Sequence, residues 1–134
     1  MLEYDHKILL VFGQTFEEEG GEAFYKWLIE NDYPELAALS SCIRGSTEAR
    51  DWLMKNKYAH FAALDGAIDN KPDACAWLRS YNYDLLLVFA EAVNGQQEAL
   101  KVFRKHDIKI LLYLVDMIRK YRNRQSFDYH KLHF

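Results

Sequence analysis

The sequence predicts an all-α solenoid of four tandem 25-residue helix-turn-helix repeats, preceded by an N-terminal capping helix. Three observations support this prediction. Trp27, Trp52 and Trp77 are spaced 25 residues apart, and a leucine follows each of them. Aromatic or apolar residues recur with the same period six positions later, at Tyr33, Tyr58, Tyr83 and Ile108. Within one unit, the apolar positions 36, 39 and 43 have the spacing of a helix face.

The 25-residue frame divides the chain without a gap from residue 21 to residue 120, into units at 21–45, 46–70, 71–95 and 96–120. Before them, residues 5–16 resemble residues 107–118, with an aspartate, a lysine and an apolar run in the same order. We expect residues 5–16 to form the capping helix. Residues 121–134 are a C-terminal extension, which folds back as a second cap or stays loose.

Two kinds of short helix should alternate along this frame. The first kind carries the apolar stripe and ends at residues that tolerate the left-handed conformation, namely Gly45, Asn70 and Gly95. No such residue stands at Lys120, so the last helix of this kind should continue to Arg124. The second kind buries Ala49, Trp52 and Leu53 at i, i+3 and i+4, so we expect the three tryptophans to be equivalent core residues.

Residues 60–83, HFAALDGAIDNKPDACAWLRSYNY, resemble the two helices of an ankyrin repeat, with an alanine-rich helix, a short turn and an A-x-x-W-L helix. The copies are eight residues shorter than ankyrin repeats, lack the T-P-L-H start and leave no room for the β-hairpin. The resemblance therefore implies a shortened, hairpin-less array used for protein binding. Convergent helical hairpins explain the same pattern equally well.

Other classes of site are not indicated. The longest apolar runs, 8–12 and 85–90, are too short for a bilayer span, and no glycine-rich nucleotide-binding motif is present. Cys42 and Cys75 form no CxxC motif and suit reduced thiols in the cytoplasm. His130 and His133, near Asp128, have the spacing of a metal pair but lack a third ligand. No acid is paired with a base in an apolar setting, so we expect a cytoplasmic protein without catalytic activity, cofactor or metal.

The helix face opposite the apolar stripe is the candidate binding surface. At frame positions 34, 38, 41 and 44, the side chains are mostly small in the first two copies and bulky or charged in the last two. If these helices line the concave side, as the ankyrin resemblance implies, this column forms the floor of a groove. The alternative, with equal weight, is that small residues only let the helices pack closely. The predicted partner-binding residues are Ser41, Arg44, Asp69, Val88, Glu91, Tyr113, Asp116 and Arg119.

Within this set, Tyr113 and Arg119 are the expected anchors, because aromatic and arginine side chains dominate interface energetics. A structural alternative for Tyr113 is that it covers the open end of the core. The preferred partner is a protein or a peptide, bound by a monomer or a weak homo-oligomer.

Two other functions stay open. Residues 101–134 contain nine Lys or Arg residues and three acidic ones, with aromatic residues between them, which is a pattern that can contact nucleic acid. The net charge of −3 weighs against this alternative, since nucleic-acid-binding domains are usually basic. The chain could also serve as a non-catalytic subunit of a larger assembly.

Overall fold

The computed structural model describes residues 1–132, with the side chains of residues 1–125. Over this range the chain is all-helical and contains no strand, which confirms the predicted all-α class. The helices are α1 (His6–Gln14), α2 (Gly21–Glu30), α3 (Pro34–Ile43), α4 (Thr47–Lys55), α5 (Ala59–Ile68), α6 (Pro72–Ser80), α7 (Asp84–Val93), α8 (Gln97–Lys105) and α9 (Lys109–Leu132).

The helix boundaries repeat with the period read from the sequence. Helices α3, α5, α7 and α9 begin at residues 34, 59, 84 and 109, and helices α4, α6 and α8 begin at residues 47, 72 and 97. Residues with positive φ recur with the same period in the connections, at Gly20, Gly45, Asn70 and Gly95, and at Asp32, Lys57, Asn82 and Asp107. The predicted left-handed positions 45, 70 and 95 are thereby confirmed, with φ values of 103°, 60° and 82°.

From α2 onward, each connection closes with the same backbone hydrogen bond, from an amide to the carbonyl five residues earlier. The amide of Tyr58 donates to the carbonyl of Leu53 at 2.8 Å, and the amide of Lys71 donates to the carbonyl of Gly66 at 3.0 Å. Such a bond, closed across a left-handed residue, satisfies carbonyl groups that a helix C-terminus would otherwise leave free. The short, regular turns therefore follow from the local sequence.

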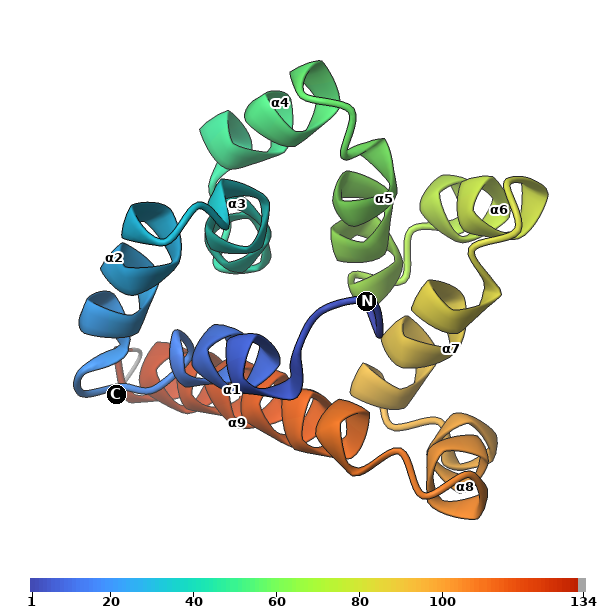
Figure 1. The fold of residues 1–134 in the computed structure, drawn as a ribbon. Helices are drawn as coiled ribbons and strands as arrows, with labels where there is room; N and C mark the ends of the chain where they lie inside the picture. The colour runs from blue at the N-terminus through green and yellow to red at the C-terminus, as the bar shows by residue number, and fades with distance from the viewer. Residues whose placement is uncertain (133–134) are drawn as a thin grey trace.

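The odd-numbered helices form a closed ring. Helix α3 packs on α5, α5 on α7 and α7 on α9, and α1 completes the ring by packing on both α9 and α3 (Figure 1). The sequence predicts that α1 caps one end of an open array, but in the structure α1 joins the two ends of the helix row. The even-numbered helices lie outside this ring, where α4 and α6 approach no closer than 8 Å between Cα atoms.

The contact between α1 and α9 is close. A Cβ atom added to Gly13 of α1 would lie 2.9 Å from the ring of Tyr113 in α9, so only glycine fits without a shift. The rings of Phe16 and Tyr121 lie 5.8 Å apart, and the Arg124 guanidinium donates to the carbonyl of Phe16. This contact joins residues that are more than 100 positions apart in the sequence.

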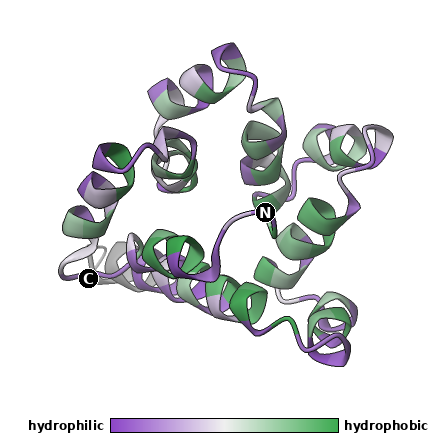
Figure 2. Cartoon of the chain, in the orientation of Figure 1, coloured by the Kyte–Doolittle hydropathy of each residue, from purple (hydrophilic) through white to green (hydrophobic). Residues whose placement is uncertain are grey.

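The core lies mainly between the odd-numbered helices. Figure 2 shows α1, α5 and α7 as largely hydrophobic and α9 as mixed, whereas α4 and α8 carry many hydrophilic residues. Fully buried side chains on the odd-numbered helices include Leu9, Phe12, Leu36, Leu39, Phe61, Leu64, Phe89, Leu111 and Leu114. Each even-numbered helix contributes one fully buried anchor, at Leu28, Leu53, Leu78 and Phe103.

The tryptophans are not core residues, contrary to the prediction. Trp27 is 37% exposed, and Trp52 and Trp77 are half-buried. Consecutive helix residues differ by about 100° in direction, so the residue after each tryptophan faces the core while the tryptophan lies to one side. There the indole ring stacks on the tyrosine six positions later. At Trp52 and Tyr58, for example, the ring centroids lie 6.2 Å apart and the ring planes differ by 9°.

The C-terminal end of the chain belongs to α9. This helix passes Lys120 and Arg124, as the missing stop residue predicts. It then continues to Leu132, so residues 121–132 of the predicted C-terminal extension are helical. Residues 133 and 134 lie outside the described range.

The different burial of Leu53 and Trp52 predicts different losses of stability when each is replaced by alanine. Leu53→Ala should lower the free energy of unfolding by about 2–5 kcal/mol, because it removes a fully buried side chain. Trp52→Ala should cost about 1–2 kcal/mol, since only part of the ring is buried and one aromatic stack is lost. Urea unfolding of both variants measures the two losses of unfolding free energy. A larger loss for Trp52→Ala than for Leu53→Ala would show that Trp52 is the core anchor.

Candidate functional site

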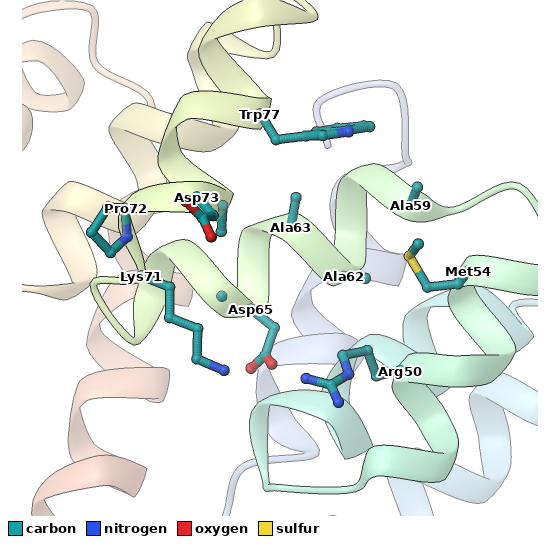
Figure 3. A pocket seen from close by; sticks show the side chains of 12 residues that line it. Arg50, Met54, Ala59, Ala62, Ala63, Asp65, Lys71, Pro72, Asp73 and Trp77 are labelled. Atoms are coloured by element: carbon teal, nitrogen blue, oxygen red, sulfur yellow. The ribbon is translucent and has the colours of Figure 1, made fainter.

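A groove of about 650 Å³ lies between α4 and α6, with α5 as its floor (Figure 3). Residues from all three helices and from the turn before α6 line it. They are Arg50, Met54, Ala59, Ala62, Ala63, Asp65, Gly66, Lys71, Pro72, Asp73, Ala74 and Trp77. The groove opens on the outside of the ring of odd-numbered helices.

Small residues on α5 keep the floor of this groove low. Ala63 corresponds to Val88 and Tyr113 in the next two units, and Gly66 corresponds to Glu91 and Asp116. A Cβ atom on Gly66 would lie 2.7 Å from the Cβ atom of Ala74, so the glycine also lets α6 pack closely on α5. The second unit therefore has room where the later units carry larger side chains.

The walls of the groove are apolar at one end. Trp77 of α6 lies over the floor, while Met54 of α4, which is 57% exposed, faces it from the other side. The indole ring of Trp77 is held by Tyr83, stacked at 5.7 Å, and by Tyr81 at 4.6 Å. An aromatic wall fixed by two neighbours is suited to bind an apolar side chain with little loss of entropy.

The other end of the groove is charged. Arg50 of α4 and Lys71 before α6 flank the half-buried carboxyl group of Asp65, and Asp73 lies on the first turn of α6 (Figure 3). Burial raises the pKa of Asp65, and the thiol of Cys42 beside it opposes that rise. Burial, helped by the Asp65 carboxylate, in turn raises the pKa of Cys42 to about 12, so this thiol is protonated at neutral pH.

The eight predicted partner-binding residues lie on α3, α7 and α9 or directly after α3 and α5. Ser41, Val88 and Glu91 are half-buried on α3 and α7, and none of the eight lines the groove. The Arg44 guanidinium lies over the Tyr25 ring at 5.5 Å, and Asp116 pairs with Lys120 at 3.0 Å. The eight residues share no cavity, so their joint role as one site stays a prediction.

The two predicted anchors have structural neighbours within the chain. Tyr113 lies against Gly13, and its hydroxyl group is 3.4 Å from the carbonyl oxygen of Leu10. The guanidinium of Arg119 lies next to Gly95 at the end of α7. The position of Tyr113 fits the structural alternative in part, although it seals the joint between α1 and α9 and not an open end.

The basic end of the chain also makes internal contacts. Arg122 donates to the carbonyl of Ile68 at 2.9 Å and pairs with Asp69 at 3.7 Å, and Arg124 donates to the carbonyl of Phe16. These carbonyl groups stand at or just after the C-terminal ends of α5 and α1, where a helix dipole favours a cation. Two of the arginines that suggested a nucleic-acid contact are therefore engaged within the fold.

The cysteines and the potential metal-binding side chains form no further candidate site in the described part of the chain. Cys42 is buried and Cys75 half-buried, both as free thiols. No group of three or more potential metal-binding side chains comes together among the residues whose side chains are described, a range that excludes Asp128, His130 and His133. None of the helices over residues 1–132 has the length and hydropathy needed to cross a membrane.

Comparison of the chain with protein-family models, with curated proteins and with solved structures gave no match.

Sequence reasoning recognised part of the groove and missed the rest. It described the column of Ala59, Ala63 and Gly66 as small and smooth, but placed the binding residues in the bulkier copies. No sequence pattern indicates Arg50, Lys71 or Met54, and the 25-residue period predicts Trp77 as a core residue. Because every tryptophan precedes a buried leucine, the helical phase of that leucine was the signal that could have placed Trp77 outside.

The close approach at the groove floor gives a second prediction. Gly66→Ala should cost about 1–3 kcal/mol from the clash with Ala74, less about 1 kcal/mol regained from helix propensity. Ala74→Gly removes the obstructing Cβ atom, so the double variant should be more stable than the sum of the single changes by about 1 kcal/mol. Denaturant unfolding of the natural protein and the three variants gives the double-mutant cycle. If the two single losses of unfolding free energy simply add up in the double variant, residues 66 and 74 are not in close contact.

Proposed function

We propose that this chain is a non-catalytic protein-interaction module, which binds a segment of a partner protein in the groove between α4 and α6. The observation that carries the proposal is the groove itself, with an alanine-lined floor, an aromatic wall and a charged end. Its volume of about 650 Å³ falls within the range of about 300–1,000 Å³ that is typical of ligand sites. All three of its sides are helices, so the site is largely preformed.

We further propose that the four 25-residue units are structural repeats of one helical hairpin. The recurring helix starts, left-handed residues and tryptophan–tyrosine stacks support this interpretation. A relationship to ankyrin repeats rests on the sequence motif of residues 60–83 alone. In a repeat array, one unit can acquire a binding site by small local changes while its neighbours keep their packing. The second unit differs in this way from the third and fourth units at Ala63 and Gly66, whereas the first unit also carries small residues there, Ala38 and Ser41.

The groove can be filled without disturbing the fold. Ala63→Tyr copies the residue that the fourth unit has at the same position, Tyr113, so the helix tolerates the side chain. Ala23→Tyr is the matched control, because Ala23 is exposed on α2 and outside the groove.

The test is selection from a displayed library of random 12-residue peptides, followed by measurement of the dissociation constants. Peptides selected on the natural protein should bind Ala63→Tyr at least tenfold more weakly and Ala23→Tyr equally well. Circular dichroism and thermal unfolding confirm that both variants are folded. The proposal is wrong if every selected peptide binds Ala63→Tyr with unchanged affinity.

A further inference from the structure

The two ends of the groove differ in chemistry, and the difference restricts what can bind. At one end, the walls and floor are apolar and surround the space below Trp77 and beside Met54. At the other end, Arg50 and Lys71 approach the groove from opposite sides, one from α4 and one from the turn before α6. A ligand that fills the groove must therefore present an apolar group and a polar group side by side.

The sign of the charge on that polar group follows from which charged side chains of the groove already have partners. Arg50 and Lys71 are exposed, and neither forms an ion pair with a residue whose side chain is described. The Asp65 carboxyl group is half-buried beside the Cys42 thiol, and it lies between Arg50 and Lys71, which line the same smaller adjoining cavity. Asp73 lies in the first turn of α6, where a negative charge is favoured by the helix dipole. Two cations thus share one half-buried carboxyl group without closing an ion pair with it, and their exposed N–H groups are left to pair with a ligand.

We infer that the segment bound in the groove carries a carboxylate next to a bulky apolar side chain; this inference rests on the proposed function. The apolar side chain lies on Ala63 between Trp77 and Met54, and the carboxylate pairs with Arg50 and Lys71. Arginine can hold a carboxylate through two parallel hydrogen bonds, which adds geometric selectivity to the charge. The carboxylate is supplied by an aspartate or glutamate side chain or by the C-terminus of the partner, and these sources share one chemistry.

Defined peptides test this inference without knowledge of the natural partner. Three dye-labelled 10-residue peptides with a central Leu-Trp pair, blocked at both ends, carry two Glu, two Gln or two Lys residues beside that pair. A fourth peptide has the Gln sequence with Leu-Trp at a free C-terminus, and its amide is the control. Fluorescence anisotropy at low and high salt gives the dissociation constants.

We expect the Glu peptide, the free C-terminal peptide or both to bind about tenfold more tightly than their uncharged counterparts at low salt. This preference should weaken at high salt, because exposed charges are screened. Arg50→Gln with Lys71→Gln should abolish it. Arg79→Gln, which changes an exposed arginine of α6 outside the groove, should not.

The possible failures are distinguishable. If all the peptides bind alike and Ala63→Tyr still blocks them, the carboxylate inference is wrong and the proposed groove function stands. If no peptide binding is sensitive to Ala63→Tyr, both fail. A concentration-dependent dimer in light scattering that Ala63→Tyr dissociates would make a second copy of the chain the occupant, and would also overturn the inference.

Discussion

The fold depends on the contact that joins α1 to α9. There, Gly13 allows the ring of Tyr113 to approach the helix backbone, and Phe16 and Arg124 extend the same contact toward the C-terminal side. Without this joint, the row of odd-numbered helices would leave two apolar ends exposed, as an open helical array does unless its ends are capped by polar surfaces. Closure removes both ends and turns a linear series of hairpins into one core.

Closure also explains where the groove lies. A closed ring of helices curves, so the helices on its outside diverge and α4 and α6 do not meet over α5. The gap becomes a groove in the second unit because Ala63 and Gly66 leave it unfilled, whereas Val88 and Glu91 occupy the same positions on α7. A constraint of the whole fold thus creates the space, and the small residues Ala63 and Gly66 leave it unfilled.

The sequence predicted the period, the helix positions and the left-handed stops, because these depend on local residue types such as Gly45 and Asn70. It failed where tertiary structure decides. The side of the helix that Trp27 occupies depends on which neighbour, Trp27 or Leu28, meets the ring of odd-numbered helices, and the contact of Gly13 with Tyr113 joins the two ends of the chain. The groove was missed for the same reason, since Met54, Arg50 and Trp77 come together only when α4 and α6 are placed around α5.

The closure of the ring is tested most directly by a nuclear Overhauser measurement between the α protons of Gly13 and the aromatic protons of Tyr113, in protein labelled selectively at these two residue types. The structure places a Cβ atom built on Gly13 within 2.9 Å of the Tyr113 ring, so a strong cross-peak is expected between residues 100 positions apart. Its loss in Tyr113→Phe labelled only at tyrosine confirms the assignment. If the folded protein gives no such cross-peak, α1 does not close the ring and the account of the fold is wrong.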